Sequence, residues 1–224
     1  MQSILTPFEA TRVSAGAQSK AIDVLTLAFA SDPICRWCWP GAGEFLNGFP
    51  AFTRAFGGRA FAAGSAYQVA GCAGAALWLS PDVEPDEAGV AAVIRDSVPA
   101  GLRESLSSLM EQMGRHHPIV PHWYLPLIGV EPVHQGLGLG SALMQPILQR
   151  CDAEGLPAYL ESTNPRNIPF YERLGFRRVG VIRAGTSPTV LPMVREAQAQ
   201  GSAAQVDDLE RSTMPLVARR GAKT

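Results

Sequence analysis

The sequence predicts an α/β fold built on one mixed sheet, and three observations lead to this prediction. An apolar run at Trp123–Val130 leads through a glycine-rich turn into a helical pattern at residues 142–151, which predicts a strand, a loop and a helix. A second apolar segment, Ala158–Ser162, follows, and two strands joined by a helix should be parallel neighbours. Residues 176–182 and 189–195 have the pattern of two final antiparallel strands.

The composition describes one globular domain of ordinary size. The chain has 224 residues, 46% of them apolar, and a net charge of −1, so no basic excess favours a nucleic-acid partner. No apolar run reaches the ~18 residues that a membrane helix needs, and the N-terminal segment does not have the pattern of a secretory signal. We therefore expect a cytoplasmic protein with no nucleic-acid or membrane partner, whose four cysteines are reduced.

The first third of the chain predicts a strand, a helix and an aromatic-rich stretch. Residues 8–13 form the strand, and residues 18–29 have apolar positions at helical spacing. Residues 35–61 carry seven aromatic side chains but are interrupted by Pro50 and a glycine pair, so one or two irregular helices are expected. They form either part of the core or the wall or lid of an acceptor pocket.

Two cysteines in this stretch, Cys35 and Cys38, have the spacing of a redox or zinc motif. A zinc site would need a second ligand pair, but Cys72 and Cys151 stand alone. A redox motif would need a preceding strand, whereas residues 30–33 are typical of a helix that ends in a turn. Packing or pocket lining is therefore predicted for both thiols.

The middle of the chain predicts a strand pair and then an insertion. Residues 65–70 and 75–79 should pair as strands, and the polar segment 82–117 contains one helical face with Pro99 before it. This insertion either covers the sheet or helps to close a pocket. Towards the end of the chain, prolines and Gly175 limit the helix within residues 164–176 to about two turns.

The glycine-rich turn has the features of an anion site. The start of a helix exposes about four unpaired N–H groups, and Gly136, Gly138 and Gly140 leave them open to a pyrophosphate. A P-loop is excluded because it needs Lys and then Ser or Thr after its last glycine. A dinucleotide loop stays open as an alternative. Ser141 occupies the position of its last glycine, which speaks against it, but the acidic residue Glu161 follows at a suitable distance. A turn that only allows close packing is a third interpretation.

A further pattern, Gln-x-x-Gly-x-Gly, is formed by Gln135, Gly138 and Gly140. It resembles the coenzyme A pyrophosphate loop of the GNAT N-acetyltransferase superfamily. A later stretch with Asn164, Tyr171 and Leu174-Gly175-Phe176 is similar to the second signature of these enzymes. More narrowly, the segments 122–125, 130–141 and 165–176 resemble the puromycin N-acetyltransferase group. The resemblance implies a GNAT fold, with a mixed central sheet of about six to seven strands, helices on both faces and a splayed central strand pair.

The resemblance also implies acetyl-CoA as the acyl donor. Its pyrophosphate would lie on the N–H groups of the glycine loop, and its pantetheine arm would pair with β-strand backbone where the two central strands separate. Pro126 fits such a separation because proline cannot donate a ladder hydrogen bond. The implied coenzyme-binding residues are Ile128, Gly129, Val130, Gln135, Gly136, Leu137, Gly138, Leu139, Gly140, Ser141, Asn164, Asn167 and Tyr171.

For catalysis, the resemblance implies direct transfer to a primary amine through a tetrahedral intermediate. Tyr171 would protonate the leaving thiolate, although it could instead be a core aromatic against Phe176. Glu161 is the first candidate for the base, followed by His122, and a water chain is an equal alternative. A small-molecule amine is favoured as acceptor. A peptide or protein amine, a non-catalytic acyl-CoA-binding module and a nicotinamide-dependent oxidoreductase are the alternatives.

The domain is expected to span residues 1–196, followed by a flexible tail at 197–224, because the tail has little periodicity. A homodimer is compatible with the predicted fold.

Overall fold

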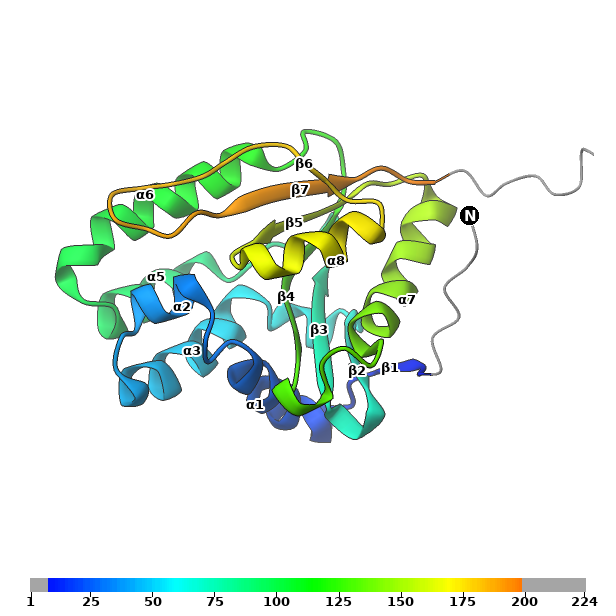
Figure 1. Cartoon of the computed structure of the whole chain (residues 1–224), viewed down its shortest axis with the longest axis horizontal. Coiled ribbons are helices and arrows are strands. Elements are labelled where there is room, and N and C mark those ends of the chain that lie inside the picture. Colours follow the sequence, from blue (N-terminus) through cyan, green and yellow to red (C-terminus); the bar gives the residue numbers. More distant parts are fainter. Residues whose placement is uncertain (1–7, 199–224) are drawn as a thin grey trace, which may run out of the picture.

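The computed structural model describes residues 8–198 and contains one sheet of seven strands in the order β1-β2-β3-β4-β5-β7-β6 (Figure 1). The β4–β5 pair is parallel, and the other pairs are antiparallel, so the sheet is mixed as predicted. The strands are β1 (Ala10–Arg12), β2 (Ala66–Val69), β3 (Gly74–Leu79), β4 (Trp123–Val130), β5 (Ala158–Ser162), β6 (Arg177–Arg178) and β7 (Leu191–Arg195).

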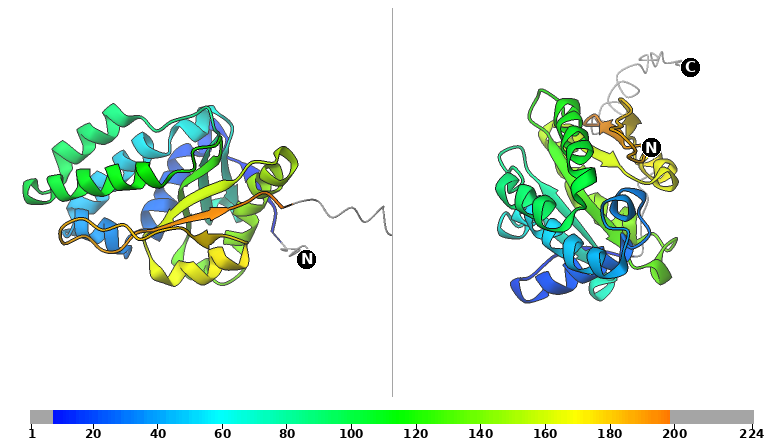
Figure 2. Two further views of the ribbon diagram at one scale, coloured as in Figure 1. Left: turned by 90° about the horizontal axis from the view of Figure 1, so that it is seen from above. Right: turned by 90° about the vertical axis from the view of Figure 1, so that its left-hand side faces the viewer.

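Helices cover both faces of this sheet, and alternating residues of the central strands feed two separate cores (Figure 2). Tyr124 and Leu127 of β4 belong to the core beneath the N-terminal helices, whereas Trp123 and Leu125 belong to the core beneath α7 and α8. The helices are α1 (Gln18–Ala28), α2 (Pro33–Cys38), α3 (Ala42–Phe56), α4 (Arg59–Ala62), α5 (Glu87–Ser97), α6 (Ala100–His116), α7 (Leu139–Glu154) and α8 (Ile168–Arg173).

The aromatic-rich stretch differs from its prediction. It forms three helices instead of one or two, and Pro50 lies inside α3 without ending it. Proline removes one intrahelical hydrogen bond, whose acceptor would be the carbonyl of Leu46. Leu46 is 61% exposed, so water can reach this part of the helix. The buried aromatic face of α3 outweighs the loss of that single bond.

The two central strands separate as the sequence predicted. β4 and β5 pair only at Trp123↔Ala158 and Tyr124↔Tyr159. Beyond Tyr124, β4 continues beside β3 alone, and the β3–β4 register shifts between Leu77 and Leu79, opposite the segment that contains Pro126. A proline in a strand cannot donate to the ladder, which explains why the irregularity falls here.

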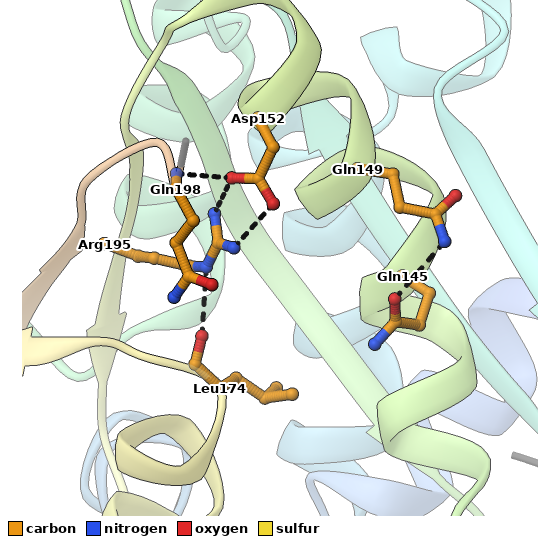
Figure 3. A network of polar contacts seen from close by, with 6 residues as sticks. All are labelled: Gln145, Gln149, Asp152, Leu174, Arg195 and Gln198. Atoms are coloured by element: carbon orange, nitrogen blue, oxygen red, sulfur yellow. Dashed lines mark hydrogen bonds and ion pairs between the residues drawn. The ribbon is translucent and has the colours of Figure 1, made fainter. Parts of the chain in front are cut away.

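A buried ion pair attaches the C-terminal end of the described domain to α7 (Figure 3). The Arg195 guanidinium donates to both carboxylate oxygens of Asp152 on α7, at 2.7 and 2.8 Å, and its Nε donates to the carbonyl of Leu174 at 3.0 Å. The backbone N–H of Gln198 adds a third bond to Asp152 at 2.8 Å. The chain therefore stays attached to α7 through Gln198, and residues 199–224 of the predicted tail lie outside the described part.

None of the helices in the described part of the chain, residues 8–198, is long and apolar enough to cross a membrane.

Candidate active site

The glycine loop lies where the sequence placed it, between β4 and α7. Gly138 is the N-cap of α7 with φ +92°, and Gly136 has φ +79°. A Cβ atom at either position would meet no heavy atom within 4 Å, so backbone conformation requires glycine there and the space above remains open. The start of α7 has no side-chain cap. Its free N–H groups and helix dipole therefore face the solvent side of the loop and suit an anion.

A groove of about 470 Å³ runs over this loop. It is bordered by β4 on one side and by the segment from Asn164 to Arg173 on the other. The expected coenzyme-binding residues that line it are Ile128, Gly129, Val130, Gln135, Gly136, Gly138, Leu139, Gly140, Ser141, Asn164, Asn167 and Tyr171. The Leu137 side chain is not among the lining residues and is 54% exposed, so only its backbone could contribute.

Two arginines in the groove wall, Arg166 and Arg173, did not emerge from the sequence as site residues. Arg166 lies in the 3-10 turn Pro165–Asn167, which Asn164 caps by accepting the Arg166 N–H at 3.1 Å. A guanidinium is well suited to phosphate oxygens. The groove thus combines a helix start with positive side chains, which fits the pyrophosphate of a coenzyme.

The free edge of β4 completes the groove. Because pairing with β5 ends at Tyr124, the backbone of residues 125–130 faces β5 without the ladder hydrogen bonds of a continuous sheet. Gly129 lets α1 pack close to this edge, since a Cβ atom there would come within 2.6 Å of the Ala28 Cβ. An extended, amide-containing arm fits such an edge, because β-strand backbone pairs with peptide-like groups.

Tyr171 lies on α8, in the wall of the groove, and is 6% exposed. Its ring packs against Phe176, with the ring centroids 6.0 Å apart, so the core-packing interpretation also describes it. Burial, and to a lesser extent the charge of Asp32, raise the pKa of Tyr171. The phenol therefore keeps its proton at neutral pH, so it can act as a proton donor but not as a general base.

A second, apolar pocket of about 80 Å³ adjoins the groove, and the two cavities share Phe29 and Asp32. Its wall contains four of the seven aromatic side chains of the aromatic-rich stretch, four residues of α6, and both Cys35 and Cys38. Burial is the main cause that raises the pKa of both thiols, to about 12 for Cys38. Protonated, pocket-lining thiols agree with the packing interpretation. Among residues 8–198, no cluster of three or more metal-ligating side chains occurs.

Asp32 is a site residue that sequence analysis missed. It is 5% exposed, and its Oδ1 caps α2 by accepting the N–H groups of Ile34 and Cys35. Its Oδ2 accepts a 2.6 Å hydrogen bond from Thr163, 131 positions away in the chain. Burial raises the pKa of Asp32, although these hydrogen bonds oppose the rise. Asp-Pro marks the start of α2 here, and the sequence interpretation took it only as the end of α1.

Glu161 lines the apolar pocket and not the groove. Its side chain is 2% exposed, and its Oε1 makes no hydrogen bond within the described chain. The nearest basic atom is Nε2 of His117, at 3.4 Å. His122 lies on the outer side of His117 and does not line the apolar pocket. The fold thus places Glu161 on the apolar pocket and Tyr171 on the groove.

A groove whose helix start and arginines suit a phosphate-bearing group, next to an apolar pocket that contains a buried carboxylate, is compatible with an acyltransferase. The chain matches the model of the Acetyltransferase (GNAT) family over residues 32–176. We conclude that the chain belongs to this family and is an N-acetyltransferase of the GNAT kind.

Relatives support this assignment. An uncharacterized N-acetyltransferase of Schizosaccharomyces pombe is 28% identical over 220 residues, covering 88% of this chain and 86% of the relative. A solved structure from Corynebacterium glutamicum, described as histone acetyltransferase HPA2 and related acetyltransferase, is 25% identical with a TM-score of 0.59 and covers 86% of this chain and 98% of that one. A polyamine N-acetyltransferase of Drosophila melanogaster is similar in fold, at 16% identity and a TM-score of 0.59, covering 84% and 99%.

Proposed function

We propose that the protein transfers the acetyl group of acetyl-CoA directly to the primary amine of a small molecule with an apolar body. One observation carries the proposal: the groove over the glycine loop adjoins, at Phe29 and Asp32, an apolar pocket whose wall contains Glu161. The two reactants would meet at this junction. An enclosed, apolar pocket suits a small aromatic or alkyl amine better than a peptide, whose backbone would need hydrogen-bonding partners.

The coenzyme would be held by this chain's own loop. The N–H groups at the start of α7, with Arg166 and Arg173, would bind the pyrophosphate. The free edge of β4 at Ile128 and Val130 would pair with the pantetheine arm, and a backbone N–H there would stabilise the negative charge that develops on the thioester oxygen.

Three proton transfers accompany the reaction. Glu161 would take a proton from the substrate ammonium, because its Oε1 is buried and has no hydrogen-bond partner among the described residues. Tyr171 would give a proton to the leaving thiolate and would regain one from the second N–H proton that the attacking nitrogen loses as the tetrahedral intermediate collapses. Asp32 is the alternative base because it lies at the junction itself, but its carboxylate already accepts three hydrogen bonds from the protein.

The experiment is a thiol-release assay with acetyl-CoA and a panel of arylalkylamines, polyamines and peptides. We expect turnover of an amine with an apolar body, and a fall in kcat of about 10²–10⁴ for Tyr171→Phe, with acetyl-CoA affinity unchanged. The matched control is Tyr67→Phe on β2, which does not line the groove. Normal kcat in a stable Tyr171→Phe variant, with chemistry rate-limiting, would leave Tyr171 as a packing residue only.

The same assay separates the two carboxylates. Asn can still cap α2 in Asp32→Asn, so this variant should fold and should lose less activity than Glu161→Gln. The opposite order would make Asp32 the base. Coenzyme binding without turnover of any amine would favour the non-catalytic acyl-CoA-binding module. Membership of the puromycin N-acetyltransferase group, a homodimer and a cytoplasmic location stay predictions.

A further inference from the structure

Two histidines connect the buried Glu161 to the surface of the protein. His117 caps the end of α6, and His122 stands one residue before β4. The Glu161 Oε1 lies 3.4 Å from Nε2 of His117, and Nδ1 of His117 lies 3.0 Å from Nε2 of His122. Nδ1 of His122 lies 2.9 Å from the carbonyl oxygen of Val120. These contacts form one line of polar atoms, in which the Glu161–His117 link is an ion-pair distance and the two outer links have hydrogen-bond geometry.

The hydrogen bonds fix the direction in which this line can carry a proton. A carbonyl oxygen only accepts, so Nδ1 of His122 carries a proton. Burial lowers the pKa of His122, so the ring is neutral near neutral pH and its Nε2 is an acceptor. His117 must therefore donate from Nδ1, which leaves its Nε2 free to accept a proton from the side of Glu161.

Exposure increases along the same line. The Glu161 side chain is 2% exposed and that of His117 is 28% exposed, while Val120 at the outer end is 56% exposed. Glu161 and Tyr124 are among six residues that line both the apolar pocket and an outer cavity, and the two histidines line only the outer cavity. The carboxylate thus lies where the acceptor pocket and the outer cavity adjoin.

Two tyrosines hold the inner histidine in place. The His117 ring centroid lies 4.6 Å from that of Tyr124 and 4.3 Å from that of Tyr159. Burial first, and the neighbouring Glu161 carboxylate second, raise the pKa of both phenols. They therefore stay protonated and do not compete with His117 for the proton.

We propose that His117 and His122 form a proton relay that carries the proton taken up by Glu161 out to solvent during each turnover. The inference rests on the proposed acetyl transfer, in which an ammonium and a thioester give an amide, a thiol and one net proton. The ammonium N–H bond breaks as the Glu161 O–H bond forms. That proton then moves to Nε2 of His117 while the Nδ1 proton of His117 moves to Nε2 of His122.

The outer histidine completes the transfer. His122, now doubly protonated and half-buried, gives one proton to water. Proton exchange with solvent, which reaches both rings, restores the starting tautomers. The path runs away from the acceptor pocket, so the proton does not have to pass the bound amine or the coenzyme.

The test replaces each histidine with Gln, which can hydrogen-bond but cannot relay a proton. For His117→Gln and His122→Gln we expect kcat to fall by about 10² with the KM for acetyl-CoA unchanged, a larger solvent isotope effect, and partial recovery of kcat on adding imidazole. Because the two act in series, the double variant should be no slower than the slower single variant. The matched control is His116→Gln on α6, since His116 contacts the Gln112 carbonyl and takes no part in the line.

The outcomes separate the relay from the acetyl transfer that it serves. If the wild-type protein turns over and both variants match the control, the relay is wrong and the acetyltransferase proposal stands. A loss of kcat that imidazole does not restore, with no change in the isotope effect, also overturns the relay. If no amine is acetylated, nitrogen-15 NMR of the histidine side chains still tests the relay. We expect a neutral His122 with its proton on Nδ1. We also expect that, among the histidine signals, only that of His117 shifts in Glu161→Gln. A proton on Nε2 of neutral His122 would refute the relay.

Discussion

The buried ion pair at the end of the domain allows a quantitative prediction. Asp152 accepts three hydrogen bonds, two of them from the guanidinium of Arg195, whose side chain is 5% exposed. In Asp152→Asn the remaining oxygen can keep the bonds that Oδ1 accepts, but the new NH₂ group faces Nη2, a donor. The guanidinium then stays buried without a counter-charge.

The expected loss follows from these contacts. Breaking a buried pair costs about 3–5 kcal/mol, and one lost hydrogen bond to a charged group accounts for about 1.5–3 kcal/mol. Because Asp152 is 20% exposed, water compensates in part, and we expect the lower end, about 3 kcal/mol of unfolding free energy. For a chain of this size that corresponds to a fall in Tm of about 6–12 °C.

Thermal and urea unfolding followed by circular dichroism would measure the change. The control is Asp96→Asn, the same substitution in an ion pair whose side chains are 66% and 65% exposed, for which no change in midpoint is expected. Equal midpoints for the two variants would refute the argument from burial.

The same pair gives a pH dependence. Burial alone would raise the pKa of Asp152, but the bonds from Arg195 and Gln198 outweigh it and lower the pKa. A carboxyl whose pKa is lowered by folding stabilises the native state above its unfolded pKa of about 3.9, and this stability is lost as the pH falls further. The difference between wild type and Asp152→Asn should therefore be constant near neutral pH and shrink below about pH 4.

Two further predictions concern acetyl-CoA binding at the glycine loop and the C-terminal tail. Gly138→Val should abolish the rise in Tm that acetyl-CoA gives the wild-type protein, because a branched side chain at φ +92° is strained and projects towards the groove. Differential scanning fluorimetry would measure the rise in Tm, and an unchanged rise would contradict the loop assignment. Truncation after Ala199 should leave Tm and coenzyme binding unchanged, because the truncated protein keeps the hydrogen bond from Gln198 to Asp152. Loss of soluble protein on truncation would show that the tail docks on the domain or on a second subunit.

The parts of the fold that local patterns determine could be predicted. The strand, glycine loop and helix around Gly138 follow from apolar periodicity and turn chemistry over adjacent residues. The separation of β4 from β5 was implied by the family resemblance, and Pro126 fits it. The length of α3 could not be predicted, because a buried aromatic face outweighs the local cost of Pro50.

The parts of the site that depend on contacts between distant segments were not predictable. Asp32 is placed at the junction by Thr163, and His117 reaches Glu161 because α6 ends beside β5. Neither pair has a sequence pattern, since the partners are joined only by the tertiary fold. The sequence could name Glu161 as a carboxylate near the end of a strand, but its separation from the coenzyme groove is visible only in the structure.

The two residue pairs that join β4 to β5 have a consequence for the mechanics of the molecule. They divide the sheet into two blocks, β1–β4 and β5–β7, and the seam between the blocks is bridged by only these two backbone residue pairs. A coenzyme arm lying in this seam would supply the missing strand contacts. Ligand binding would therefore also hold the two blocks of the sheet together. Amide hydrogen exchange should then slow on both sides of the seam when acetyl-CoA binds, including at β5 positions that the ligand never touches.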